Sequence, residues 1–388
     1  MTNSIIDHIT PYVAELTAIR RDIHAHPEIG MEEYRTSELV AKQLEAWGVE
    51  VHRNVGKTGV VGVLRNGPGP AIGLRADMDA LPIHEQTNLE YSSRNHGVMH
   101  ACGHDGHTTM LLGAARYLAE TRNFTGTVNF IFQPGEEGMG GALAMLEDKL
   151  FERFPCEAIF GMHNAPGMPV GKFGIAPGTA MAGGAFFDIT ITGRGAHGAR
   201  PEESIDPVLV VSTLASALQS IVSRNISPSD TAVLSVTRML VGDAYNVIPE
   251  TGLLGGTVRT MKRETMVLIE ANMRRLATSI ATGYGAEAKV DFRLIFAPLV
   301  NDAAQLTVVA DAAASIVGDA EVNRTRPPVM ASEDFAFMME KIPGAFINLG
   351  NGGDSAPVHN HQYNFNDAAI PYGVALWASV VEQKLARS

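Results

Sequence analysis

The sequence contains few of the residues that mark secreted or membrane proteins. Only two of its 388 residues, Cys102 and Cys156, are cysteines, which is too few for a disulfide framework. Its first nine residues, MTNSIIDHI, lack the basic start and apolar run of a secretory signal, and no apolar run approaches the ~18 residues of a membrane span. We therefore expect a cytoplasmic protein without a membrane partner.

Positive charge and aromatic side chains are also scarce. The 42 acidic residues outnumber the 30 Lys and Arg, which gives a formal net charge of -12, and no cluster of Lys and Arg forms a phosphate-binding stripe. Aromatic residues make up only 6% of the chain, too few to indicate a surface on which bases stack. We therefore expect no nucleic-acid partner.

Hydrophobic residues are abundant, at 45% of the chain, so that sizeable cores are expected. A single core rarely serves 388 residues, and two domains are the first expectation. In the first part of the chain, helical spacing alternates with short apolar runs. We predict two helices between Ile5 and Trp47, further helices over Leu111–Leu118 and Met139–Phe151, and strands over Gly59–Leu64, Ala71–Leu74, Thr127–Phe132 and Ala158–Met162. This order predicts an α/β fold with a central mixed, mostly parallel sheet flanked by helices.

The pattern changes at Phe186, where apolar and polar residues begin to alternate as in a half-buried strand. A helix over Pro207–Val222, strands over Ala232–Leu240 and Leu253–Arg259, a helix over Glu264–Thr282 and a strand over Ala288–Ile295 are predicted to follow. The β-α-β-β-α-β order is that of a ferredoxin-like sandwich. We therefore expect an inserted domain, residues 184–296, that interrupts a first domain of residues 1–183 and 297–388. The first domain should resume with helices over Ala303–Val317 and from about Tyr372.

Histidine is concentrated in one short segment. The sequence MHACGHDGH places Cys102 and His104 close together, along with His100, Asp105 and His107, just before a predicted helix. Zinc and similar ions bind imidazole, thiolate and carboxylate, so this density indicates a metal site. Taken alone, the segment could also be a capping loop with a buried cysteine and solvated histidines.

Other predicted strand ends offer ligands of the same kinds. Glu136 and Glu137 follow the strand that ends at Phe132, and His163 follows the next predicted strand. A C-terminal loop carries His359 and His361. Each residue has a structural alternative, such as a solvated carboxylate or a core histidine. Because α/β folds place their sites at the carboxyl ends of strands, the joint pattern favours one shared metal site.

Two further segments offer supporting groups. Asp77 and Asp79 follow a strand and either ligate metal, accept a proton from a ligating imidazole, or cap a turn. In the inserted domain His197 stands on a glycine-rich turn, and Asn246 and Arg259 lie near strand ends. An arginine there suits capture of a carboxylate and a histidine can donate to an oxyanion, although a surface arginine and a turn histidine are the simpler alternative.

The motifs together resemble the aminoacylase and carboxypeptidase family of di-metal amidohydrolases, and in particular its hippurate hydrolase and indole-acetyl-amino-acid hydrolase branch. The segments RRDIHAHPEIGMEE, GLRADMDALP, HACGHDGHTTMLLGAA, IFQPGEEG, GMHNAPGMPVGKF, GRGAHGARPEESIDPV, GTVRT and ASEDFAFM occur in family order over nearly the whole chain. The resemblance implies a di-metal catalytic α/β domain interrupted by a smaller lid domain that mediates dimerisation. It therefore implies a homodimer or higher homo-oligomer, with which the strand near Phe186 to Thr192 is compatible.

The resemblance also implies a role for each matching residue. It implies metal ligation by Cys102, His104, Glu137, His163 and His359. It implies Glu136 as general base, His197 as an oxyanion donor to a neighbouring subunit's site, and Asn246 and Arg259 as the binding site for the substrate carboxylate. His361 stands where the family usually has proline and competes with His359 as ligand, whereas Asp77 stands where distant relatives place a ligand histidine.

These roles imply hydrolysis of the amide bond of a small-molecule N-acyl amino acid by two divalent metal ions. Cys102 favours zinc, and the other ligands also suit manganese, cobalt or nickel. A metallo-dipeptidase or carboxypeptidase is the nearest alternative, and a catalytically inactive metal-binding or ligand-binding homologue is an alternative of another class. A structural zinc module is disfavoured, because its ligands would lie close together in sequence.

Overall fold

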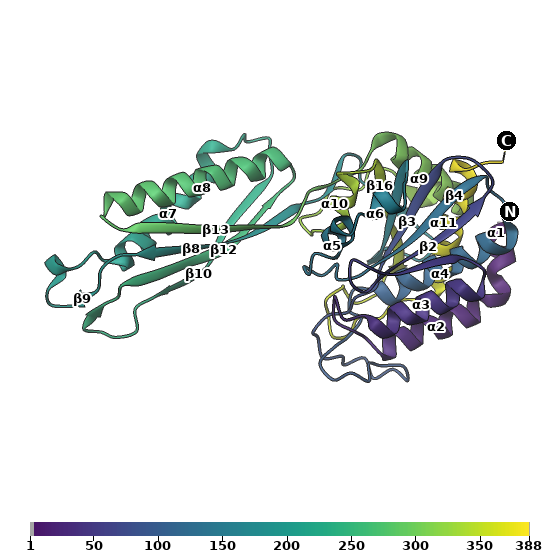
Figure 1. Cartoon of the computed structure of the whole chain (residues 1–388), viewed down its shortest axis with the longest axis horizontal. Helices are drawn as coiled ribbons and strands as arrows, with labels where there is room; N and C mark the ends of the chain where they lie inside the picture. The colour runs from purple at the N-terminus through teal and green to yellow at the C-terminus, as the bar shows by residue number, and fades with distance from the viewer. Residues whose placement is uncertain (1–3, 388) are drawn as a thin grey trace. The chain divides into compact units, whose positions relative to one another are not determined.

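The computed structural model describes residues 4–387, which form two compact units. The first comprises residues 4–180, 300–327 and 334–387, and the second comprises residues 181–299 and 328–333. Figure 1 labels helices and strands of both units.

The described part of the first unit is built on an eight-stranded sheet. The strands lie in the order β1 (Glu50–Val55), β2 (Gly59–Asn66), β4 (Gly126–Gln133), β3 (Ala71–Asp77), β5 (Ala158–Pro166), β16 (Gly344–Gly352), β6 (Phe173–Gly174) and β15 (Val322–Asn323). The central strands β4, β3, β5 and β16 pair in parallel, whereas β1, β2 and β4 pair antiparallel. The expected mixed sheet with a parallel centre is confirmed.

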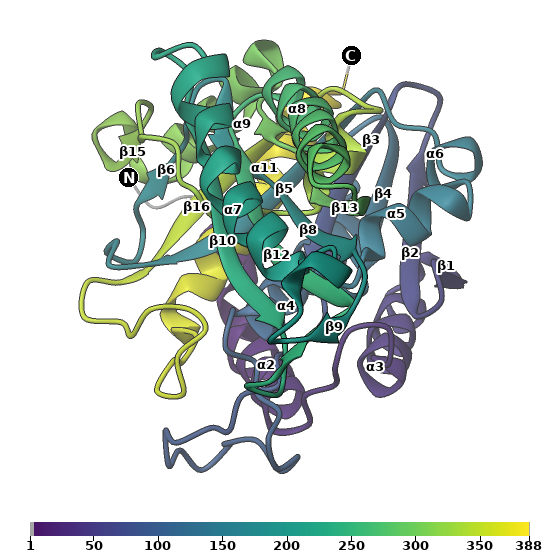
Figure 2. The ribbon, with the colours of Figure 1, turned by 90° about the vertical axis from the view of Figure 1, so that its left-hand side faces the viewer.

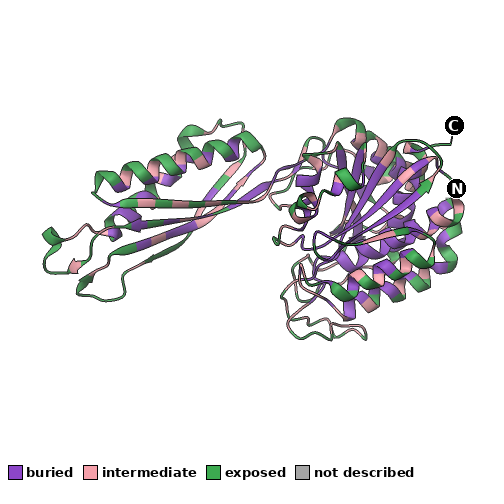
Figure 3. Cartoon of the chain, in the orientation of Figure 1, coloured by how far each residue is buried: buried purple, intermediate pink, exposed green. Residues whose placement is uncertain are grey.

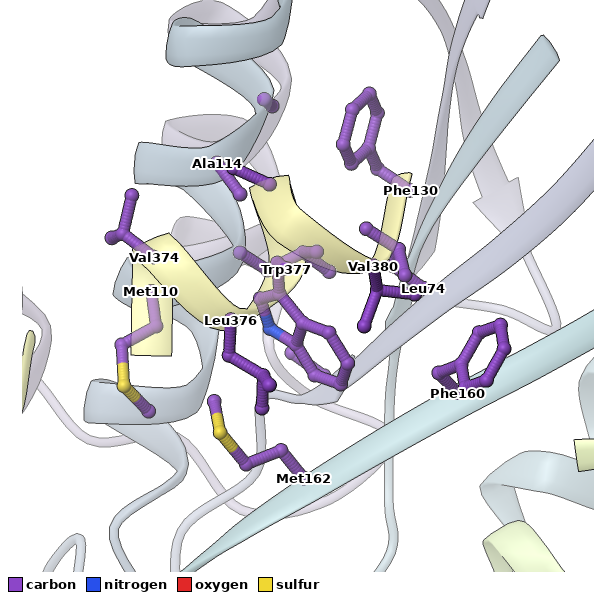
Figure 4. Packing of buried hydrophobic residues seen from close by; sticks show 14 of the residues in the cluster. Leu74, Met110, Ala114, Phe130, Phe160, Met162, Val374, Leu376, Trp377 and Val380 are labelled. Carbon is purple, nitrogen blue, oxygen red and sulfur yellow. The ribbon is translucent and has the colours of Figure 1, made fainter. Parts of the chain in front are cut away.

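Helices cover both faces of this sheet. They are α1 (Ser4–Ile9), α2 (Val13–Ala25), α3 (Tyr34–Ala46), α4 (His104–Thr121), α5 (Gly141–Glu147), α6 (Leu150–Arg153), α9 (Ala303–Val317), α10 (Phe335–Met339) and α11 (Ile370–Lys384). On one face α11 packs between α4 and α9. There the buried Trp377 of α11 lies near Met110 of α4 and Phe160 of β5 (Figure 4). On the other face Gly161 of β5 leaves room for Phe335 of α10.

The prediction of one continuous helix over Met139–Phe151 is wrong. The chain forms α5, then turns through Lys149 with φ of +60°, and then forms α6. A left-handed residue cannot continue a helix, and lysine carries no sequence signal for that conformation. The structure also contains the strand β16, where the sequence pattern predicts none.

The second unit is a four-stranded antiparallel sheet with two helices on one face. The sheet order is β10 (Ala232–Val241), β12 (Thr251–Thr260), β8 (Gly183–Thr192) and β13 (Glu287–Phe296), and the helices are α7 (Pro207–Asn225) and α8 (Arg263–Gly283). The helices pack side by side, as Figures 1 and 2 both show. This is the expected ferredoxin-like order. The segment near Phe186 to Thr192 lies inside the sheet, whose edges are β10 and β13.

The shorter strands complete the described chain. β9 (Ala196–His197) pairs with β11 (Val247–Ile248) within the second unit. β7 (Thr179–Met181) and β14 (Leu299–Val300) lie where the chain passes from one unit to the other.

From the sequence we expect no apolar run close to the length of a membrane span, but helix α7 has both the length and the apolar composition of one. Among the described residues it is the one helix that meets both criteria, which the core helices of many proteins also meet. Asp206 caps its first turn, and its buried residues, including Leu214, pack in the core of the second unit. Other residues of α7, such as Leu209, are exposed. Figure 3 shows buried and exposed residues alternating along the helical layer of this unit.

A buried ionic network joins α2 to the start of α4. Asp105 Oδ2 lies 2.8 Å from His24 Nδ1 and accepts a hydrogen bond of 3.4 Å from Arg20 Nη1, while His24 Nε2 lies 3.3 Å from Glu85 Oε1. Burial disfavours the charged imidazole, but the hydrogen bonds to Asp105 and Glu85 outweigh it and raise the pKa of His24 from 6.5 to about 9. The network therefore fixes the first turn of α4 through charged groups.

We expect His24→Gln to destabilise the protein most below about pH 6.5. Because the pKa of His24 is raised on folding, its contribution is fully present below about pH 6.5 and is lost as the pH rises through about 9. The difference in free energy of unfolding between wild type and variant, measured by urea denaturation, should shrink between pH 7 and pH 10. A difference that stays constant over this range would contradict a charged His24.

Two identical substitutions in α7 test its packing. Leu214→Ala should lower the free energy of unfolding by about 2–5 kcal/mol, because it leaves a cavity in the core. Leu209→Ala on the exposed side of the same helix should cost less than about 1 kcal/mol. Equal losses in urea denaturation would show that the exposed side of α7 is also covered.

Candidate metal centre

The parallel strands bring the candidate ligands to one edge of the large sheet. Asp77, the last residue of β3, is paired with Gln133, the last residue of β4, and the loop after β4 carries Glu136 and Glu137. His163 lies near the end of the neighbouring strand β5. Segments that are far apart in the sequence therefore meet at the carboxyl ends of the parallel strands.

Five candidate ligands form one cluster of overlapping groups. Within each group the ligand atoms all lie within 4.8 Å of one another; the groups are Cys102, His104 and His163; Cys102, Glu137 and His359; and His104, Glu136 and Glu137. Cys102 Sγ lies 3.2 Å from His163 Nε2, and His359 Nε2 lies 3.0 Å from Glu137 Oε1. The structure thus brings together all five residues for which metal ligation was implied.

The ring orientations of two histidines fit a metal ion. Nδ1 of His104 lies 2.9 Å from the Asp79 carbonyl oxygen, while its Nε2 is buried without a hydrogen-bond partner. Nδ1 of His163 donates to the Asn164 carbonyl at 2.7 Å, which leaves Nε2 facing Cys102. When Nδ1 carries the proton, the Nε2 lone pair is available to a cation.

The electrostatics of the cluster also suit a cation. Burial raises the pKa of the Cys102 thiol well above its usual range. Burial and the neighbouring His107 lower the pKa of His163 to about 3, so that its imidazole is neutral at pH 7. A buried thiol gives up its proton only when a positive charge lies beside it, and a neutral imidazole is the form that binds metal. The donor set therefore fits a divalent ion that binds thiolate and imidazole.

Asp79 supports two ligand segments. Its Oδ1 lies 3.1 Å from His104 Nδ1, and its Oδ2 accepts the backbone N–H of Glu137 at 2.9 Å. One carboxylate thus joins the loop after β4 to the start of α4. Of the roles that the sequence leaves open for Asp79, this arrangement fits that of a partner to a candidate ligand histidine.

Asp77 is held by two other side chains. His107 Nδ1 lies 2.6 Å from Asp77 Oδ1, and Arg75 donates to Oδ2 at 2.8 Å. Burial disfavours the carboxylate, but His104 and Arg75 outweigh it and hold the pKa of Asp77 well below its usual range. Oδ2 lies 3.7 Å from His104 Nε2, so a negative charge stands beside the candidate ligands.

The C-terminal loop places His359, and not His361, in the cluster. His359 has φ of +60°, a strained conformation that is held by its backbone N–H, which donates to Ala101 O at 2.7 Å. The side chain of His361 is exposed, and among the described residues it belongs to none of the ligand groups.

Glu136 is buried beside the candidate ligands. Its Oε1 accepts the backbone N–H of Asp334 at 3.4 Å. Asp334 is anchored in turn by Gln133 and by the backbone N–H of Ala142. The sequence around Asp334 carries no local signal for this position, because its partners lie about 200 residues away.

The second unit places His197 and Asn246 apart from Arg259. His197 pairs with Val247, next to Asn246, whereas Arg259 pairs with Gly184 at the beginning of β8. From Gly184 to the end of β8 at Thr192 the strand runs about 26 Å, and β9 lies beyond that end (Figure 1). The structure therefore does not bring Asn246 and Arg259 of one chain together.

The side chains of His197 and Arg259 can each donate a hydrogen bond to an anion. His197 Nδ1 accepts the backbone N–H of Ala199 at 3.0 Å, so that the neutral ring carries its proton on Nε2. The guanidinium of Arg259 donates to Thr257 Oγ1 at 2.6 Å and forms no ion pair with an acid in the described chain. Partial burial lowers the pKa of Arg259, because burial disfavours its unpaired charge.

Comparison with known proteins supports these observations. The chain is 42% identical to the hippurate hydrolase of Campylobacter jejuni subsp. jejuni, over 97% of this chain and 98% of that protein. It is 41% identical to the N-acetylcysteine deacetylase of Bacillus subtilis, over 92% of this chain and 93% of that protein.

A solved structure shows the same fold. The Bacillus subtilis YXEP protein, described as a dinuclear metal binding peptidase, superposes with a TM-score of 0.84 at 36% identity, covering 97% of this chain and 99% of that one. The model of Peptidase family M20/M25/M40 matches residues 73–383. By this match and by its relatives over nearly the full length, the protein belongs to Peptidase family M20/M25/M40.

Proposed function

We propose that this protein is a metal-dependent amidohydrolase that cleaves N-acyl amino acids into a carboxylic acid and a free amino acid. The observation that carries the proposal is a buried carboxylate, Glu136, that stands within one cluster with five candidate metal ligands. Relatives named for hippurate hydrolysis and N-acetylcysteine deacetylation support the substrate class.

The site would hold two divalent metal ions, as the dinuclear solved relative supports. Cys102, His104, Glu137, His163 and His359 would be their ligands. We propose zinc first because of the thiolate, with manganese, cobalt and nickel as alternatives. Bound ions would polarise the scissile carbonyl and acidify the attacking water.

Glu136 would move the proton of the reaction. Its carboxylate would accept a proton from the attacking water and deliver it to the leaving amine. The N–H of Asp334 would hold the carboxylate in place during both transfers. Asp77 and Asp79 would support the ligands, since both oxygens of each are held by neighbouring groups.

Arg259 would bind the free carboxylate of the substrate. A half-buried guanidinium without an acidic partner in the described chain gains an ion pair when an anion binds. Such a contact selects N-acyl amino acids and peptides over simple amides. A dipeptidase or carboxypeptidase would use the same contact, so the acyl group must be decided by experiment.

His197 would act on the site of a second subunit. Its Nε2–H can donate to the developing oxyanion. His197 and Asn246 are separated from Arg259 of the same chain by the length of strand β8. We therefore propose a homodimer or higher homo-oligomer through the inserted unit. Its edge strand β10 carries the exposed apolar side chains Val233, Met239 and Leu240, which support this role.

We expect Glu136→Gln to remove turnover and to leave metal binding intact. Wild type reconstituted with zinc, manganese or cobalt should release amino acid from N-acetyl or N-benzoyl amino acids faster than from dipeptides, and a chelator should stop it. Glu136→Gln should lower kcat by about 10²–10⁴-fold at unchanged metal content.

Glu147→Gln is the matched control, because it makes the same substitution at an exposed glutamate of α5, and it should keep wild-type kcat. Metal loss together with turnover in Glu136→Gln would contradict the division of roles between Glu136 and Glu137. Metal binding by wild type without release from any substrate would favour an inactive binding homologue.

Mixing two inactive variants should restore activity if His197 acts in a second subunit. Glu136→Gln and His197→Ala, denatured and refolded together in equal amounts, would form mixed dimers with one intact site each. We expect about one quarter of wild-type activity from random pairing. If the mixture stays as inactive as its components while the refolded wild type recovers, His197 serves its own chain.

A further inference from the structure

Asn164, directly after His163, forms hydrogen bonds to other segments that carry candidate ligands. Its Nδ2 donates to the Cys102 carbonyl at 2.6 Å and lies 3.1 Å from His107 Nε2. Its backbone N–H also donates to His107 Nε2 at 3.0 Å. Both side-chain N–H groups of this buried amide are thus used on the segment that carries Cys102 and His104.

The carbonyl side of the same amide reaches the C-terminal loop. Tyr363 donates its hydroxyl to Asn164 Oδ1 at 2.7 Å, and both residues are buried. Tyr363 lies four residues after His359, and its backbone N–H donates to Asn360 O. One amide therefore joins three ligand-bearing segments, namely the loop before α4, the end of β5 and the C-terminal loop.

Gly103 leaves the space that this arrangement needs. A Cβ atom at residue 103 would lie 2.3 Å from Asn164 Nδ2 and 2.5 Å from Tyr363 Oη. Gly103 also has φ of +97°, which other residues rarely adopt. The glycine between Cys102 and His104 is thus required by the amide and hydroxyl that pack on it.

The network continues to the carboxylate behind the cluster. Because His107 Nε2 accepts from Asn164, its proton lies on Nδ1 and is donated to Asp77. Both nitrogens of His107 are therefore engaged by protein groups. This explains why the His-rich segment contains a third histidine that need not bind metal.

We propose that Asn164 and Tyr363 are positioning residues that set the geometry of the metal centre. Asn164 fixes the Cys102 backbone and the His107 ring, and Tyr363 fixes the amide and the loop that carries His359. The inference rests on the proposed metal-dependent function. Groups behind the ligands commonly change metal affinity by about 10–100-fold when they are removed.

The test uses cobalt as the probe, because its visible bands report coordination geometry and its near-ultraviolet band reports thiolate ligation. In the full-length protein, Asn164→Asp keeps the acceptor for Tyr363 and the backbone N–H donor to His107, but it removes the side-chain N–H donors to Cys102 and His107. Cobalt affinity, measured by competition with a chelator, should fall about 10–100-fold and the visible bands should shift. Tyr363→Phe should give a smaller loss, because the bonds of Asn164 to Cys102 and His107 remain.

Matched controls separate positioning from general stability. Asn129→Asp alters another buried amide, which donates to the Pro155 carbonyl and to Cys156, away from the ligands. Tyr117→Phe removes another buried hydroxyl, which donates to Glu382. Both should lower the thermal unfolding midpoint of the metal-free protein and keep wild-type cobalt affinity and bands.

The inference is overturned if Asn164→Asp and Tyr363→Phe lose stability like their controls but bind cobalt as wild type does. If Asn164→Asp does not fold, Tyr363→Phe decides alone, since it removes a single oxygen atom. Wild type that binds about two cobalt ions per chain but hydrolyses no substrate would contradict the proposed function and leave this test valid. Wild type that binds no cobalt would overturn both.

Discussion

The parallel pairing of β4, β3, β5 and β16 is the constraint on which the candidate site depends. Parallel strands end at the same edge of a sheet, so the loops that follow them converge whatever their distance in sequence. Glu136, His163 and the start of α4 are thereby brought together before any metal binds. The antiparallel strands β1 and β2 extend the sheet on the side of β4 away from β3 and contribute no candidate ligand.

Buried charges then hold the converging loops in place. Arg75 and Asp77 are both buried, and so are Arg20, His24 and Asp105 behind α4. Ion pairs of this kind gain little net stability, because desolvation offsets most of their attraction. They do fix direction, since a hydrogen bond tolerates less displacement than an apolar contact. A site that brings five candidate ligands into one cluster gains more from direction than from stability.

Sequence predicted the parts of this protein that depend on local pattern. The ferredoxin-like order follows from alternation and helical spacing, and the ligand cluster follows from unusual residue types at strand ends. The break at Lys149, the choice between His359 and His361, and the role of Asn164 were not predictable in this way. Each depends on backbone conformation or on partners far away in sequence, and the residue types themselves carry no signal for it.

The second unit separates two residues for which we propose roles in the same reaction. Arg259 and His197 lie towards opposite ends of β8, whereas a single amino-acid substrate spans only a few ångströms between its carboxylate and its amide carbonyl. No rotation of the unit as a rigid body brings both residues of one chain to the same substrate. If both residues act as proposed, they must come from different chains, and the complete active site exists only in the assembled oligomer. Oligomerisation would then be a requirement of the chemistry, over and above any contribution to stability.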